Sequence, residues 1–257
     1  MTPEDIDQAA GMLAASRTMA GRFNRFPAQC HPADLADGYA IQHALHGLLG
    51  PVAGYKIGCT TPVMQKYLGI DHPCAGGIFA DSIHTSPAVL KHRNFRRVGV
   101  ECEIAVRLDR DLPAGPYSRE SVADAVGECM AAIELVDDRY IDYKQLDAAS
   151  LIADDFFGAG CVLGEARRDW QSLDLAACGA IMTVNGKDAG RGSGAMVLGH
   201  PLEALAWLAN NLVERGNSLR QGDIVMTGSM VETRWLEAGD WVDVTIDRLG
   251  VAAVSLT

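Results

Sequence analysis

A single segment, residues 98–108, constrains the fold more than any other part of this chain. Its residues alternate strictly between an apolar set and a mixed set that contains Glu101 and Glu103. A period of two is the side-chain repeat of a β-strand, whose successive side chains point to opposite faces of the sheet. Because one face is wholly apolar, we expect this strand to lie inside the protein and to present both glutamates on its second face. The apolar set is Val98, Val100, Cys102, Ile104, Val106 and Leu108, and the mixed set is Gly99, Glu101, Glu103, Ala105 and Arg107.

Residues 1–50 are typical of a helical lobe. Thr2 can cap a helix that has Pro3 at its first position, and apolar residues recur at helical spacing over residues 35–49. Short apolar stretches broken by glycine begin at Val52 and are typical of strands and tight loops. We therefore expect N-terminal helices packed on a β-rich part, residues 51–257, within one structural unit.

Local patterns predict several elements of the β-rich part. Residues 118–130 predict a helix, residues 131–136 a second core strand, and residues 201–212 a helix with an apolar stripe. Gly222-Asp223 and Gly239-Asp240 each predict a turn that leads into a strand. We expect those two strands to be consecutive strands of one sheet.

The charge balance argues against a nucleic-acid-binding protein. The 22 basic and 33 acidic residues give a net charge of −11, which repels phosphate backbones. No apolar run reaches the length of about 18 residues that spans a membrane, and the acidic N-terminus is unlike a signal peptide. The 7 cysteines form no CxxC pair, which favours buried thiols over disulfides or a zinc site. We expect a cytoplasmic protein that binds neither nucleic acid nor membranes.

Glu101 and Glu103 are the first candidates for chemistry. Two like charges in the interior cost several kcal/mol unless a positive group neutralises them. The alternative is a face open to water, as in antiparallel sheets with one solvated side. Glu134 favours the first interpretation, because it interrupts the otherwise apolar segment 131–136. If the three carboxylates meet, they form an all-oxygen site suited to Mg²⁺ or Mn²⁺, although spacing alone leaves open whether Glu134 meets the pair.

Two further charged residues stand in unusual places. Lys56 lies in a strand-like segment between Gly54 and Gly58. Such a lysine is usually a surface residue, but beside a carboxylate–metal site it would bind an anionic substrate. Asp81 follows the apolar segment 77–80, and its own context favours a turn or cap residue.

These residues together resemble the fumarylacetoacetate hydrolase superfamily, and in particular its hydratase/decarboxylase branch, typified by 2-keto-4-pentenoate hydratases. The resemblance runs from about Leu35 to the C-terminus. Ile133-Glu134 followed by Asp137-Asp138-Arg139 is similar to the hydratase/decarboxylase form rather than to the carbon–carbon hydrolases. The similar segments are residues 54–60, 77–81, 100–104, 133–139, 198–201 and 222–229, followed by the second Gly-Asp turn and Leu249-Gly250.

The resemblance implies an α+β fold, a mixed β-roll or distorted β-sandwich with N-terminal helices against it. It implies that Glu101, Glu103 and Glu134 bind a divalent cation, Mg²⁺ or Mn²⁺. Lys56 would orient the substrate, and Asp81 would transfer a proton or position water. The other substrate-binding positions that it implies are Thr60, Phe157 and Ser229, and it implies a homo-oligomer.

The activity implied is that of a hydratase, a lyase of aromatic-compound degradation. It would add water to a short 2-hydroxy-2,4-dienoate, such as 2-hydroxypenta-2,4-dienoate, to give a 4-hydroxy-2-oxo acid. The alternatives are a 4-oxalocrotonate-type 2-oxo acid decarboxylase, an acylpyruvate-type carbon–carbon hydrolase, and a catalytically degenerate binding subunit. Phe156-Phe157-Gly158 motivates these alternatives, because relatives resemble Ala-Ser-Ser there and place a serine near the substrate. Two phenylalanines would shrink the pocket or favour an apolar substrate tail.

Overall fold

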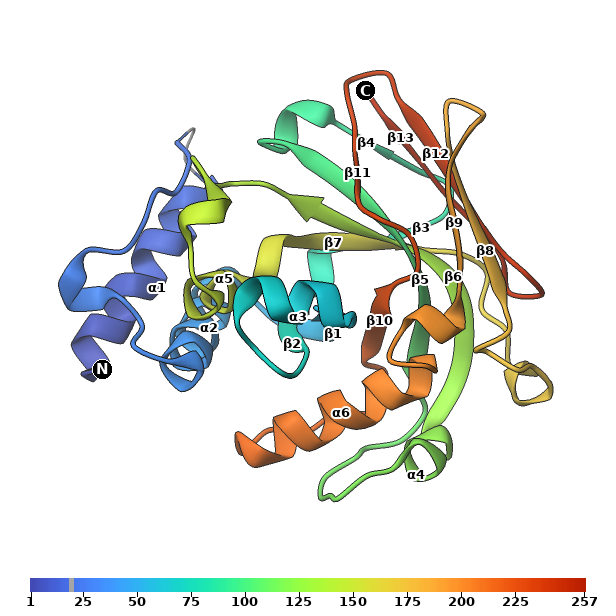
Figure 1. Cartoon of the computed structure of the whole chain (residues 1–257), viewed down its shortest axis with the longest axis horizontal. Coiled ribbons are helices and arrows are strands. Elements are labelled where there is room, and N and C mark those ends of the chain that lie inside the picture. Colours follow the sequence, from blue (N-terminus) through green and yellow to red (C-terminus); the bar gives the residue numbers. More distant parts are fainter. Residues whose placement is uncertain (19–20) are drawn as a thin grey trace.

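The structure, a computed structural model, describes residues 1–18 and 21–257 and begins with two helices (Figure 1). These are α1 (Pro3–Thr18) and α2 (Leu35–Leu49). Thr2 caps α1 as predicted, since its hydroxyl accepts a hydrogen bond from the Asp5 amide at 3.2 Å. Helix α2 packs against α1 and against α5 (Ala148–Ala153), so the predicted N-terminal lobe also contacts a segment far along the chain.

An eight-stranded mixed sheet follows the helices. Its order is β2-β1-β10-β5-β6-β7-β3, and β11 pairs with β5. The β1–β10 and β3–β7 pairs are parallel, whereas β5 is antiparallel to both β10 and β6. Strand β5 covers the residues that alternation predicted. The strands are β1 (Val52–Gly58), β2 (Cys74–Phe79), β3 (Ile83–Thr85), β5 (Val98–Leu108), β6 (Val126–Asp137), β7 (Gly158–Leu163), β10 (Ile224–Ser229) and β11 (Arg234–Trp235).

A five-stranded sheet, in the order β4-β13-β12-β8-β9, lies at the opposite end of the molecule from α1 and α2 (Figure 1). Its strands β12 and β13 pack on β6, and the apolar face of β5 belongs to the same buried cluster. Helix α6 (Pro201–Glu214) packs on β10 and on α4 (Arg119–Ala123), and α3 (Pro62–Leu68) follows β1. The predicted α+β class is confirmed. The strands are β4 (Ala88–Leu90), β8 (Gly179–Val184), β9 (Lys187–Ser193), β12 (Trp241–Ile246) and β13 (Gly250–Leu256).

The glutamate-bearing face of β5 lies inside a curl of the larger sheet. Strands β2 and β7 are far apart in the strand order, yet they contact each other. A second apolar cluster on this inner face includes Ala105, Met130 and Met226. The curl therefore excludes the solvated-face interpretation for Glu103, which is fully buried.

Two sequence predictions were wrong. The helix expected over residues 118–130 is only α4 (Arg119–Ala123), and β6 already begins at Val126. Glu128 faces Arg107 across the β5–β6 pair and accepts a hydrogen bond from its guanidinium at 2.9 Å, which favours the strand. The strands after the two Gly-Asp turns, β10 and β12, belong to different sheets.

No helix in the described part of the chain combines the length and the apolar character needed to cross a membrane.

Candidate functional site

Three glutamates converge on the inner face of the larger sheet. Glu101 and Glu134 are directly opposite each other in the β5–β6 register, and Glu103 is opposite Ser229 of β10. One carboxylate oxygen from each glutamate lies within 4.8 Å of the other two. Strand register therefore brings together the residues that the sequence left unconnected.

Neighbouring residues fix two of these carboxylates. Glu103 accepts a hydrogen bond from the Gly228 amide at 2.8 Å, and the Thr233 hydroxyl donates one to Glu101. Gly228 has a φ of 123°, and a Cβ there would lie 2.6 Å from the Thr60 side chain. Glycine is thus needed at this position both for its backbone conformation and for the close approach of Thr60.

The carboxylates are short of positive partners. Glu103 Oε1 has no hydrogen-bond partner among the described residues. Burial and the charges of Glu134 and Glu101 hold the pKa of Glu103 well above its usual range. Burial and the charge of Glu134 raise the pKa of Glu101 to about 7. An all-oxygen set with an unpartnered buried oxygen fits a hard divalent cation, which would neutralise this repulsion.

Lys56 comes from β1, two strands away from β5 in the sheet. Its ammonium donates a hydrogen bond to the Phe156 carbonyl at 2.6 Å and lies 3.2 Å from Glu134 Oε1, in an ion pair without hydrogen-bond geometry. Burial lowers the pKa of Lys56, but the charges of Glu134 and Glu101 outweigh it and raise this pKa overall. Lys56 is therefore a charged lysine beside the three carboxylates.

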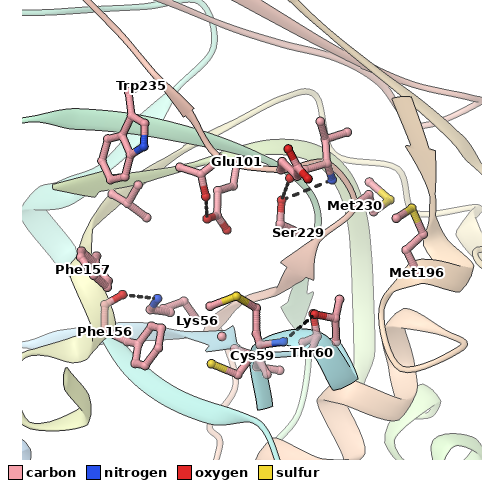
Figure 2. A pocket seen from close by; sticks show the side chains of 18 of the residues that line it. Lys56, Cys59, Thr60, Glu101, Phe156, Phe157, Met196, Ser229, Met230 and Trp235 are labelled. Atoms are coloured by element: carbon pink, nitrogen blue, oxygen red, sulfur yellow. Dashed lines mark hydrogen bonds between the residues drawn. The ribbon is translucent and has the colours of Figure 1, made fainter. Parts of the chain in front are cut away.

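A pocket of about 490 Å³ opens beside this cluster. Figure 2 shows the Lys56 ammonium and the Glu101 carboxylate on opposite sides of its open space. Thr60, Ser229 and Phe157, which the resemblance assigned to substrate binding, all line it. The rest of the wall is mainly apolar and includes Val136, Tyr143, Phe156, Met196, Met230, Val231 and Trp235.

The phenylalanines stand in an unusual backbone conformation. Asp155, Phe156 and Phe157 have φ values of 53°, 50° and 67°, the left-handed region that non-glycine residues rarely adopt. The Phe157 ring makes edge contacts with Tyr140, Tyr143 and Phe156. Aromatic side chains thus build the wall where relatives are expected to place a serine.

Asp81 is not brought to this cluster. It is exposed on a 3₁₀ turn (Ala80–Ser82) and is absent from the pocket lining. The proton-transfer role predicted for it finds no support in the geometry of this chain. The motif match identified the segment, but the buried acid next to that segment is Asp155, which binds the Gly77 amide at 2.8 Å.

Sequence reasoning missed several groups that shape the site. They are the Phe156 carbonyl, the Gly228 amide, Thr233, and the pocket-lining residues Glu232 and Trp235. Two of them are backbone groups, which carry no residue-type signal. Glu232 and Thr233 lie just after residues 222–229, so the end of that motif was the available clue.

Comparisons with known proteins show what this chain is similar to. The family described as "Fumarylacetoacetate (FAA) hydrolase C-terminal" matches residues 79–257. A 2-keto-4-pentenoate hydratase of Burkholderia vietnamiensis (strain G4 / LMG 22486) is 35% identical over 232 residues, 89% of this chain and 88% of that protein. A 2-hydroxyhexa-2,4-dienoate hydratase of Comamonas testosteroni is 34% identical over 209 residues, 80% of this chain and 78% of that protein.

Solved structures share the fold. A 4-oxalocrotonate decarboxylase from Pseudomonas putida G7, complexed with magnesium and adipate, has a TM-score of 0.94 at 24% identity. The match covers 100% of this chain and 99% of the decarboxylase chain. A fumarylpyruvate hydrolase from Pseudomonas aeruginosa, in complex with Mn²⁺ and pyruvate, has a TM-score of 0.63 at 17% identity. The match covers 79% of this chain and 88% of the hydrolase chain.

Proposed function

Because this chain belongs to the fumarylacetoacetate hydrolase family, we propose that it is a divalent-metal-dependent hydratase. Its substrate is a short 2-hydroxy-2,4-dienoate such as 2-hydroxypenta-2,4-dienoate, and its product is a 4-hydroxy-2-oxo acid. The names of the relatives at 34–35% identity support this activity. An aromatic-degradation role follows from the same substrate class.

The observation that carries the proposal is the uneven distribution of charge around the pocket. The charged residues of the lining are Lys56, Glu101 and Glu232. Glu101 belongs to the carboxylate cluster, and Glu232 is exposed. Apart from Lys56, the described lining contains no lysine, arginine or histidine. One cationic end and a mainly apolar wall suit a substrate with a single carboxylate and an apolar tail.

Glu101, Glu103 and Glu134 would hold the cation, and neighbours crystallised with magnesium, calcium or Mn²⁺ support a divalent ion. When bound, such an ion supplies Lewis-acid stabilisation of negative charge on a substrate oxygen. The Thr233 hydroxyl and the Gly228 amide keep two of the carboxylates in place through their hydrogen bonds. We propose Mg²⁺ or Mn²⁺ as the ion.

Lys56 binds the anionic end of the substrate. Its ammonium has three N–H donors, of which one is used by the Phe156 carbonyl and another faces Glu134. A remaining donor is free to bind the substrate carboxylate or its 2-oxygen. Thr60 and Ser229 add hydroxyl groups to the same part of the pocket, and Phe157 contacts the tail.

Water addition to 2-hydroxypenta-2,4-dienoate removes its conjugated chromophore, so ultraviolet absorbance reports the reaction. The purified chain with Mg²⁺ or Mn²⁺ should consume this dienoate, and E101A should abolish the loss of absorbance. An inactive metal-loaded wild type would contradict the proposal.

The competing activity is decarboxylation of 4-oxalocrotonate-type diacids, for which the structural likeness at 24% identity shows only a shared fold. A diacid needs a second cation for its far carboxylate, and the described lining offers none. Carbon dioxide released from 2-oxohex-3-enedioate under the same conditions would identify a decarboxylase instead.

We further propose that the chain forms a homo-oligomer and works in the cytoplasm. The free, buried cysteine thiols support a reducing compartment. Light scattering of the purified protein measures the oligomeric state, and a monomer would contradict the first part.

A further inference from the structure

A part-buried hydrogen-bond network lies behind the pocket wall, outside the residues that line it. The Asp155 side chain is almost fully buried. Its carboxylate accepts hydrogen bonds from His46 Nε2 at 2.7 Å, from the Gly77 amide at 2.8 Å and from Arg17 Nη2 at 2.9 Å. Three donors thus converge from α1, α2 and β2 on one side chain.

Glycines make room for this network. A Cβ at Gly77 would lie 2.6 Å from the His46 ring, and a Cβ at Gly76 would lie 2.8 Å from the Asp155 carbonyl oxygen. Both contacts are shorter than real Cβ atoms tolerate. Gly77 therefore makes room for the His46 ring, and Gly76 makes room for the Asp155 backbone.

The network ends one residue away from the group that binds Lys56. Asp155 begins the left-handed stretch of residues 155–157, and Phe156, in its middle, presents its carbonyl to the Lys56 ammonium at 2.6 Å. Three successive non-glycine residues in this region cost on the order of 1–3 kcal/mol each, so the surrounding contacts must hold them. The buried contacts of the Asp155 side chain provide this anchor at the first of the three residues.

The Phe156 carbonyl in turn competes with the carboxylates for Lys56. Glu134 Oε1 is 3.2 Å from the same ammonium, and the charges of Glu134 and Glu101 both attract it. A carbonyl fixed within hydrogen-bond distance of the ammonium limits how far the ammonium can move onto the carboxylates. Without it, we expect Lys56 to pair more fully with the glutamates and to lose its orientation toward the pocket.

We propose that His46 and Asp155 are positioning residues for Lys56, acting through the left-handed turn and the Phe156 carbonyl. The role of Lys56 as the substrate's cationic partner rests on the function proposed above, whereas the mechanical link from His46 to Lys56 does not. The two parts are therefore tested by different measurements.

Gln42 provides a matched control for His46. It lies one turn earlier on α2, is buried, and donates to the carbonyls of Ala75 at 2.9 Å and Ile152 at 2.8 Å. Q42A thus removes buried hydrogen bonds between α2 and the same region, but it leaves the carboxylate of Asp155 untouched. H46Q, which keeps a side-chain N–H donor, is the rescue variant.

The first measurement needs no substrate. The rate at which an amine-reactive acylating reagent labels Lys56, relative to Lys66 in the same sample, is followed by mass spectrometry in the full-length chain. H46A should lower the relative labelling of Lys56 several-fold, because the ammonium pairs more fully with the glutamates and turns away from the pocket, whereas Q42A and H46Q should leave it near the wild-type value. Equal labelling in H46A and Q42A would overturn the link from His46 to Lys56.

The second measurement is the affinity of the Mn²⁺-loaded chain for 2-oxopentanoate, determined by calorimetry together with the affinity for Mn²⁺ alone. H46A should weaken binding of the 2-oxo acid by about 10-fold or more, while its affinity for Mn²⁺ stays near that of Q42A. In a K56M background the same substitution should cause no further loss, because its effect passes through Lys56. Additive losses would overturn the proposal, whereas a wild type that binds Mn²⁺ but no 2-oxo acid would count against the proposed function only.

Discussion

Glu101 and Glu134 face each other in direct register across the β5–β6 pair, with Glu103 completing a set of oxygens within 4.8 Å of one another. Like charges directly opposite in an antiparallel pair are destabilising. This arrangement is therefore unfavourable for the chain alone and becomes favourable when a cation occupies the space between the carboxylates.

We expect bound metal to stabilise the chain against heat. At a free Mn²⁺ concentration 100 times the dissociation constant, binding to the folded chain increases the free energy of unfolding by about 2.7 kcal/mol. E103Q should abolish this gain, yet it should stabilise the metal-free chain because it removes one of the repelling carboxylates. Calorimetric melting of both proteins with Mn²⁺ and with chelator measures the two effects. A metal-dependent gain that survives in E103Q would contradict the assignment of this ligand.

The stability of the metal-free chain should depend on pH because the buried carboxylates repel one another. Burial and the charge of Glu134 raise the pKa of Glu101 from 4.5 to about 7, so the folded chain holds this proton more tightly than the unfolded chain does. The stability contributed by protonated Glu101 is present below pH 4.5 and is lost as the pH rises toward 7.

Other groups titrate in the same range, so the effect of Glu101 is measured as the difference in free energy of unfolding between wild type and E101Q. Urea unfolding in chelator should show the wild type losing stability relative to E101Q between pH 4.5 and about 7. Saturating Mn²⁺ should reverse this trend for the wild type. A difference that is flat, or that rises with pH in chelator, would contradict the electrostatic account.

K56M should separate substrate binding from metal binding. It removes the ammonium that pairs with Glu134, so we expect kcat/KM for the dienoate to fall by on the order of 100-fold, as for loss of a charge-stabilising donor. The Mn²⁺ affinity should not fall, because the ligand oxygens remain and one competing cation is gone. Steady-state kinetics and calorimetry give the two values, and a K56M enzyme with wild-type kcat/KM would exclude the role of Lys56.

F157A should change which tails the pocket accepts. Phe157 lines the pocket and makes edge contacts with Tyr140 and Tyr143, so removing its ring enlarges the apolar end. We expect the ratio of kcat/KM for a dienoate with a longer alkyl tail to that for the five-carbon dienoate to increase. The same ratio in V89A, at an exposed position of β4, serves as the control. An unchanged ratio in F157A would show that this ring does not contact the tail.

D81N tests Asp81, the predicted catalytic residue whose position in the structure does not support a catalytic role. Asp81 is exposed and outside the pocket lining, so kcat/KM and stability should change by no more than a typical surface substitution, within about 0.5 kcal/mol. A loss of several hundred-fold in kcat would instead restore its proton-transfer role and require a neighbouring subunit or a rearrangement to bring it to the substrate.

The sequence predicted those parts of the fold whose signal is local. The strict alternation of residues 98–108 gave the strand β5 with its bounds, and the helical spacing of residues 35–49 gave α2. Residues 126–130 were misassigned because the feature that holds them in a strand, the Arg107–Glu128 pair, lies across the sheet. Local preference carries no information about such partners.

The same distinction applies to the site. Glu101 and Glu103 share a face by their spacing alone, but Glu134 joins them only through strand register. Sequence context singled out Glu134 and Lys56, and the family resemblance assigned their roles. The His46–Asp155 pair joins residues that are 109 positions apart and matched no motif, so only the folded chain brings it to notice.

The central claim is that three glutamates on the inner face of one sheet hold a single divalent cation. The most direct test is calorimetric titration of the chelator-treated chain with Mn²⁺, with E134Q as its partner variant. We predict one ion per wild-type chain and a loss of affinity of at least about 10-fold in E134Q. A wild type that binds no Mn²⁺, or an E134Q variant that binds it as tightly as the wild type, would contradict the account.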